Sequence, residues 1–179
     1  MKLYRKSPTS LEYWEAWESD GTTVVHWGRV GERGETVELA ASPSRSWLKK
    51  FWQRCIAATV RGPASLEGLP REVLKEQRRR QQQGFVEIPI EEHATLLIEY
   101  RVDGMGSAED LDKRHRLEDL LNELLGWTGL GICDGGSIGS GTMEACCFVV
   151  DFEIARRVIA ETLQGTDFQD YSRIYDDSA

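Results

Sequence analysis

Residues 11–30 read LEYWEAWESDGTTVVHWGRV, two strand-forming runs on either side of the turn signal SDG. Aromatic and β-branched residues are enriched in both runs, as they are in β-strands. A glycine-containing tight turn between two such runs predicts a β-hairpin. A second turn at residues 31–34 and a third run at residues 35–39 extend the pattern. The chain up to about residue 39 is therefore predicted to form a small antiparallel sheet.

Two helices and a short strand are predicted to follow this sheet. The first helix opens at residues 42–43, where serine precedes proline, and its apolar residues recur at helical spacing until the dipeptide GP ends it. The second helix covers residues 70–83 and contains the run RRR at residues 78–80, which we expect on a solvated helix face. A short strand at residues 85–88 leads into a linker. We therefore predict a first domain that spans residues 1–90.

The second half of the chain carries a clear series of strand and helix signals. Apolar residues alternate in its first strand, and residues 145–150 are continuously apolar, as in a central strand. Ser107 and Asp110 have the spacing of a capping box, and leucines form a stripe on one face of the helix that follows. The predicted elements are a strand at 96–102, a helix at 107–126, strands at 130–133 and 144–150, a helix at 151–165 and a strand at 172–175. This β-α-β-β-α-β order is the ferredoxin-like plan, which places two helices on one face of an antiparallel sheet.

The segment VHWGRVG at residues 25–31 is the strongest candidate for recognition. On a strand, Trp27 and Arg29 share one face, while His26 and Gly28 share the other. An exposed indole beside a guanidinium offers a stacking plane and a planar fork for phosphate. The alternative is that Trp27 is a core residue and Arg29 forms a structural ion pair. The overall acidity of the chain favours this alternative, because phosphate contacts dominate nucleic-acid affinity.

This segment, with YWEAW before it, a helix after it and QGFVE at residues 83–87, resembles the WGR domain. That module occurs in DNA-dependent poly(ADP-ribose) polymerases and in many bacterial proteins, and the resemblance covers about half of this chain. It implies that Trp27 packs on a terminal nucleotide. The side chains that would meet phosphates or a partner protein are those of Arg29, Arg33, Lys49, Lys50 and Arg54.

Residues 42–84 are longer than the single helix usual in the family, which implies an insertion near residues 62–70. No counterpart of the polymerase catalytic domain follows, so we expect no ADP-ribosyl transfer. The predicted fold class is α+β. A WGR-like small antiparallel sheet with helices occupies residues 1–90, and an acidic ferredoxin-like domain occupies residues 91–179.

The charge of the chain differs between the two predicted domains. Residues 1–90 hold 15 Lys or Arg and 11 Asp or Glu, a formal charge of +4. Residues 91–179 hold 7 and 19, a formal charge of −12, so the whole chain carries −8. A strongly negative domain repels phosphate and attracts a basic protein surface. The candidate contact residues on this domain are Asp110, Asp112, Asp119 and Asp134.

Three functional hypotheses follow. The first is a non-enzymatic WGR protein that binds nucleic acid, with DNA ends or nicks as the candidate ligand, or that regulates a DNA-acting partner. The second is an acidic protein-binding module, such as an immunity protein or antitoxin that neutralises a basic toxin. The third is an enzyme built on Asp134 and the glycine-rich residues 135–142. This segment lacks the Lys-Ser/Thr of a phosphate-binding loop and leads into a strand, so we expect a mobile hairpin connection.

No cofactor and no metal ion are expected. The four cysteines have no metal-ligand spacing and indicate buried thiols, and the three histidines have no ligand-like spacing either. No apolar run approaches the roughly 20 residues of a membrane span, and the N-terminus has no secretory signal. We therefore expect a cytoplasmic protein without a membrane partner, and we predict no oligomeric state.

Overall fold

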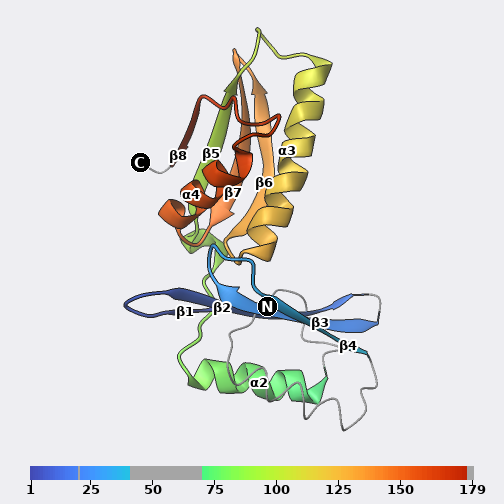
Figure 1. The fold of residues 1–179 in the computed structure, drawn as a ribbon, viewed down its shortest axis with the longest axis vertical. Coiled ribbons are helices and arrows are strands. Elements are labelled where there is room, and N and C mark those ends of the chain that lie inside the picture. The colour runs from blue at the N-terminus through green and yellow to red at the C-terminus, as the bar shows by residue number, and fades with distance from the viewer. Residues whose placement is uncertain (20, 41–69, 177–179) are drawn as a thin grey trace. The chain divides into compact units, whose positions relative to one another are not determined.

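The computed structural model describes residues 1–19, 21–40 and 70–176. The fold is mixed α+β, as predicted, with two four-stranded antiparallel sheets (Figure 1). The chain divides into two compact units, Met1–Ile88 (unit 1) and Pro89–Ala179 (unit 2). The predicted boundary after residue 90 falls two residues beyond this division.

Unit 1 is a meander of four strands with a helix. Its strands follow one another in the sheet in chain order, and the predicted hairpin is confirmed, with Trp14 opposite Trp27. The predicted strand at residues 85–88 reduces to a single bridge between Tyr4 and Val86. The elements are β1 (Lys2–Lys6), β2 (Leu11–Ser19), β3 (Thr22–Arg29), β4 (Glu35–Ala40) and α2 (Arg71–Gln82). The predicted helix that opens at residues 42–43 and the predicted insertion near 62–70 lie outside the described residues.

The main hydrophobic cluster of unit 1 lies on one face of this sheet, where alternate side chains of each strand meet. The buried residues that form it are Leu3, Trp14, Ala16, Val25, Trp27 and Leu39 from the strands, with Val73 of α2 and Phe85 just after that helix. Figure 1 shows α2 running along one side of the sheet. The helix therefore closes the face that carries both tryptophans.

Unit 2 follows the predicted β-α-β-β-α-β order, and its strands are arranged β6-β7-β5-β8. The predicted capping box is confirmed, because Ser107 accepts a hydrogen bond from the backbone N–H of Asp110. Asp151 caps the second helix by accepting one from the backbone N–H of Ile154. The elements are a short 3-10 helix (Ile90–Glu92), β5 (Ala94–Arg101), α3 (Ala108–Trp127), β6 (Gly131–Gly139), β7 (Thr142–Val149), α4 (Phe152–Leu163) and β8 (Arg173–Asp176).

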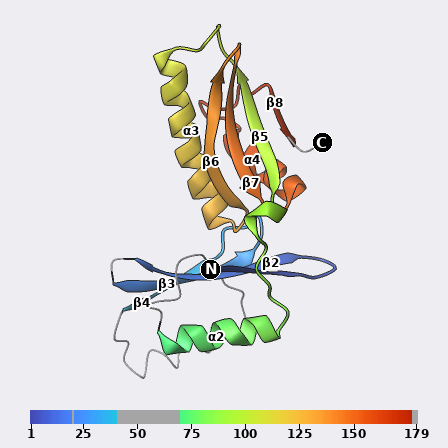
Figure 2. The same cartoon turned by 180° about the vertical axis from the view of Figure 1, so that it is seen from behind.

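The two helices of unit 2 cover one face of its sheet. Residues paired across β5 and β7 on this face are fully buried, among them Leu96 with Cys147 and Ile98 with Ala145. The leucine stripe of α3 packs inward, with Leu117, Leu121 and Leu125 at 0% exposure. Figure 2 views the sheet from the side opposite to α4. None of the helices in the described parts of the chain is long and apolar enough to cross a membrane.

The glycine-rich segment differs from its prediction. Strand β6 continues through it to Gly139 and β7 begins at Thr142, so the turn consists of Ser140 and Gly141 alone. Both have positive φ, 54° and 89°, as a two-residue type I′ hairpin requires. Within β6, a side chain at Gly136 would collide with the carbonyl oxygen of Glu144. The strands were predicted too short because glycine is usually depleted in strands.

Candidate functional site

Trp27 lies in the core of unit 1 and not on its surface. Its side chain is 2% exposed and belongs to the cluster that Val73 and Phe85 close. Trp27 and Arg29 do share a face, since their register partners Trp14 and Glu12 are also two residues apart. The expectation that the indole stacks on a nucleotide is nevertheless wrong, because Val73 of α2 and Phe85 cover that face of the sheet. The core alternative holds for Trp27.

Packing explains two glycines, Gly28 in β3 and Gly34 in the turn that follows it. A side chain at Gly34 would collide with the carbonyl oxygen of Trp27 and with the hydroxyl of Tyr13. A Cβ on Gly28 would lie 2.9 Å from the Cα of Gly34 and 2.9 Å from the Tyr13 hydroxyl. The turn after β3 therefore folds back against the strand at a distance that only glycine allows.

His26 lies on the sheet face opposite to Trp27 and is fully buried. Its ring meets that of Tyr13 edge-on, with centroids 5.7 Å apart and an interplanar angle of 75°. Burial lowers the pKa of His26 to about 4, against the opposing effect of a hydrogen bond with the Gly34 backbone. The imidazole is therefore uncharged at neutral pH.

Two of the five basic candidates of unit 1, Arg29 and Arg33, lie within the described residues. Arg29 is exposed at the end of β3 and lies 3.5 Å from the carboxylate of Glu32. Arg33 is exposed in the following turn. Lys49, Lys50 and Arg54 lie outside the described residues.

The arginine run of α2 is not a uniform solvated face. Arg80 is 7% exposed at its side chain and pairs with Glu76 at 2.7 Å, while Glu76 itself is 3% exposed. Arg79 contacts the same carboxylate at 3.3 Å, and Arg78 is exposed. Arg79 and Arg80 therefore share one carboxylate, while Arg78, about 100° further around the helix from Arg79, is exposed. The expectation of a solvated run is wrong for Arg80, whose partner lies one turn earlier.

The acidic candidates of unit 2 fall into two groups. Asp110 and Asp112 are engaged, the first in the helix cap and the second in an ion pair with Arg116 at 3.1 Å. Asp119 and Asp134 are exposed and form no ion pair within residues 91–176. Glu123 was not among the predicted contact residues, yet it is exposed one turn beyond Asp119, a spacing that puts both on one helix face.

Asp134 lies beside this part of α3. The side chain of Asn122 accepts a hydrogen bond at 3.0 Å from the backbone N–H of Cys133, which directly precedes Asp134. Asn122 is the neighbour of Glu123 in α3. We call Asp119, Glu123 and Asp134 the acidic surface. Asp119 and Glu123 come from α3 and Asp134 from the edge strand β6, whose backbone the Asn122 side chain joins to the helix one residue before Asp134.

Most basic side chains of unit 2 are paired with its own carboxylates. Five of the seven lysines and arginines in residues 91–179 form such ion pairs. These pairs are Lys113–Asp170 at 2.7 Å, Arg114–Glu118 at 3.2 Å, Arg116–Asp112 at 3.1 Å, Arg156–Glu153 at 2.7 Å and Arg173–Glu99 at 2.6 Å. Most cations of unit 2 are thus paired internally while carboxylates remain in excess, and the acidic surface belongs to this excess.

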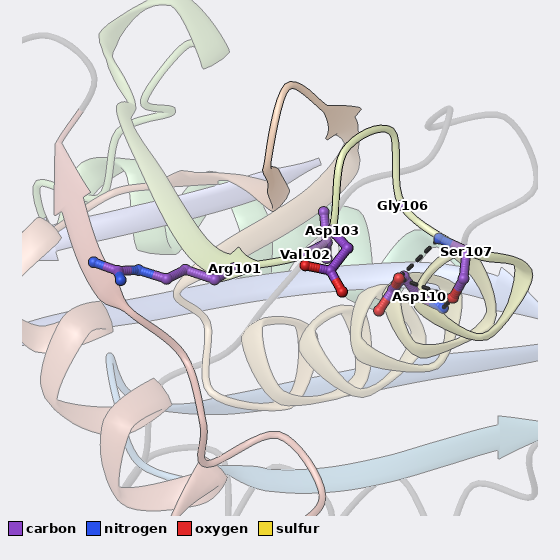
Figure 3. A pocket seen from close by; sticks show the side chains of 6 residues that line it. All are labelled: Arg101, Val102, Asp103, Gly106, Ser107 and Asp110. Atoms are coloured by element: carbon purple, nitrogen blue, oxygen red, sulfur yellow. Dashed lines mark hydrogen bonds between the residues drawn. The ribbon is translucent and has the colours of Figure 1, made fainter.

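A cavity of about 430 Å³ opens where β5 leads into α3. Its lining residues are Arg101, Val102, Asp103, Gly106, Ser107 and Asp110 (Figure 3). The carboxylate of Asp110 accepts hydrogen bonds from the backbone N–H and the hydroxyl of Ser107, both at 2.8 Å. These bonds lower the pKa of Asp110. In Figure 3 the Arg101 side chain points away from this pair, so Asp110 serves the helix cap.

Replacing Ser107 with alanine is expected to destabilise unit 2 by about 1 kcal/mol, because the first turn of α3 loses its capping oxygen. Thermal unfolding followed by circular dichroism measures the effect. Ser172→Ala, at an exposed position before β8, is the matched control and should leave the melting temperature unchanged. Equal stability of the two variants would show that the capping box contributes nothing.

On the face of the unit 2 sheet opposite to its helices, three polar side chains form hydrogen bonds with one another. Glu144 accepts hydrogen bonds from the hydroxyls of Ser137 at 2.9 Å and Tyr175 at 2.7 Å. The second bond raises the pKa of Tyr175 to about 12. Among the described residues, no three His, Cys, Asp or Glu side chains are grouped to hold a metal ion. No protein-family model, no curated protein and no solved structure matches this chain.

Proposed function

We propose that this protein is a non-enzymatic binding protein whose unit 2 docks on a basic surface of a partner protein. An immunity protein or antitoxin that covers a basic toxin is the class that fits this role. The observation that carries the proposal is the excess of carboxylates at the acidic surface, where Asp119, Glu123 and Asp134 are exposed and form no ion pair within residues 91–176.

Carboxylates without an ion pair in unit 2 are suited to recognition, because no internal ion pair has to break when they bind a partner protein. Asp112, by contrast, would have to release Arg116, which lies 3.1 Å away. Complementary charge across an interface raises the association rate and disfavours wrong partners. It acts over about 10 Å at ordinary ionic strength. Like charges on one helix face and on the adjoining strand therefore give a pattern that a basic partner can match.

We also propose a fold type for each of the two units. We infer that unit 2 is a ferredoxin-like domain, supported by its strand order β6-β7-β5-β8 and its two helices. We infer that unit 1 is a WGR-type module, supported by its four-stranded meander and by the packing constraints at Gly28 and Gly34.

Nucleic-acid binding is the second candidate function. With Trp27 in the core, it rests on phosphate contacts alone, from Arg29 and Arg33, which are both exposed at one end of β3. Lys49, Lys50 and Arg54, outside the described residues, are further candidates in the sequence. Binding of this kind is independent of base sequence and falls steeply with salt.

The double charge reversal Asp119→Lys/Glu123→Lys is expected to weaken the complex with the partner by about 100-fold at low salt, since like charges placed across an interface cost several kcal/mol. The full-length protein is first purified from its own cells with its bound partner, which is identified by cross-linking and mass spectrometry. Affinities are then measured by titration at two salt concentrations.

The matched control is Glu153→Lys/Glu161→Lys, which makes the same charge change at two exposed positions of α4. It should leave the affinity within a few-fold of the parent. Equal loss in both variants would mean that only net charge matters, and unchanged affinity after the α3 reversal would reject the proposed surface. In a parallel titration with nicked duplex DNA, binding that Arg29→Ala/Arg33→Ala weakens would favour the second candidate.

A further inference from the structure

Two cysteines of unit 2 lie directly opposite each other on neighbouring strands. Cys133 of β6 is the register partner of Cys147 of β7. The backbone N–H of Cys133 points outward to the side chain of Asn122, so the two cysteines form a non-hydrogen-bonded pair. In such pairs the Cα atoms are about 4.5 Å apart, inside the range of about 4.4–6.8 Å that a disulfide spans.

The two thiols also point the same way. Both side chains lie on the helix-covered face of the sheet, with Cys133 6% exposed and Cys147 0% exposed. The Cys133 thiol donates to the Gly135 carbonyl oxygen at 3.9 Å. The interaction between the two thiols lowers the pKa of Cys133 and raises that of Cys147. Cys133 is thus both the more accessible sulfur and the one more readily present as a thiolate, the reactive form.

We propose that Cys133 and Cys147 are a peroxide-sensitive dithiol that closes to a disulfide across β6 and β7. The inference concerns a covalent modification and is independent of the proposed partner surface. It uses side chains that are already in register, so the backbone needs no rearrangement.

The reaction needs a hydroperoxide, a small oxidant suited to a thiol with little exposure. The Cys133 thiolate attacks one peroxide oxygen, the O–O bond breaks, and the product is a sulfenic acid with release of hydroxide. The Cys147 sulfur then loses its proton and attacks the Cys133 sulfur, the S–O bond breaks, and water leaves. In total, two thiols and one hydrogen peroxide give one disulfide and two waters.

The test treats the folded full-length chain with hydrogen peroxide, blocks the remaining thiols and maps linked peptides by mass spectrometry. The background is Cys55→Ser/Cys146→Ser, so that only the proposed pair is left of the four cysteines. We expect a peptide link between Cys133 and Cys147 in the folded protein, reversed by dithiothreitol. We also expect a melting temperature about 5 °C or more higher, because the link restricts the unfolded chain.

The parent chain with all four cysteines serves as the second measurement, since its peptide map needs no substitution in the core. There too the Cys133–Cys147 link should dominate over links that use Cys146, which lies on the opposite face. Over-oxidation of Cys133 to sulfinic acid without a link, or a link that forms only in denaturant, would overturn the inference. Loss of partner binding in the α3 charge reversal would leave this result unaffected.

Discussion

Replacing Trp27 with alanine is expected to lower the free energy of unfolding of unit 1 by about 3–5 kcal/mol, the usual cost of removing a large aromatic side chain from a core. The indole is 2% exposed and packs in the cluster that includes Trp14, Val73 and Phe85. Its removal leaves a cavity that the sheet and α2 cannot fill without moving. Denaturant unfolding followed by circular dichroism measures the loss, and hydrogen exchange on peptides from β2 and β3 locates it in unit 1.

Arg29→Ala is the matched control, because it changes the neighbouring member of the same motif at an exposed position. Its stability should stay within about 0.5 kcal/mol of the parent, as for most surface substitutions. The free energy of unfolding of Trp27→Phe should lie between those of Trp27→Ala and Arg29→Ala. If Trp27→Ala kept full stability and instead abolished a binding activity, the indole would have to reach solvent and the core assignment would fail.

Glu76→Ala is expected to destabilise unit 1 by about 3 kcal/mol, because it leaves a buried guanidinium without its carboxylate. Arg80 is 7% exposed at its side chain and lies 2.7 Å from Glu76, so water cannot replace the lost partner. Arg79 loses the same contact, although it is more exposed and loses less. Urea unfolding of the parent and the variant gives the difference directly.

The double variant Glu76→Leu/Arg80→Met separates the buried charge from the packing. Replacing both partners with apolar residues of similar size is often neutral or stabilising, so this variant should recover most of the lost stability. Arg78→Ala, at the exposed position of the same run, should change stability little. A double variant as unstable as Glu76→Ala would mean that the ion pair is required for more than mutual neutralisation.

Local signals predicted most of unit 2. The capping box at Ser107 and Asp110 marks the start of α3, and the leucine spacing identifies the side that is buried. Both signals depend on residues that are close in the sequence, so they can be recognised without the tertiary structure. The glycine-rich part of β6 was not predicted as a strand, because glycine has a low strand propensity. Its strand conformation comes from pairing with β7.

The candidate sites depended on contacts between distant residues. Alternation placed Trp27 and Arg29 on one face, and the register bears this out, but it carries no information about which face a helix covers. The acidic surface likewise joins α3 to β6 through a hydrogen bond between Asn122 and Cys133. No spacing in the sequence connects these two positions.

By itself the sequence determined the α+β class, the order of the described helices and strands in unit 2, the hairpin of β2 and β3 and the uneven charge of the two halves. The tertiary structure alone decided that an indole suited to stacking is core, that one arginine of three is buried against a carboxylate and that two cysteines face each other. The physical reason is that periodicity and capping are properties of neighbouring residues. Burial and pairing are set by whichever distant element packs against them.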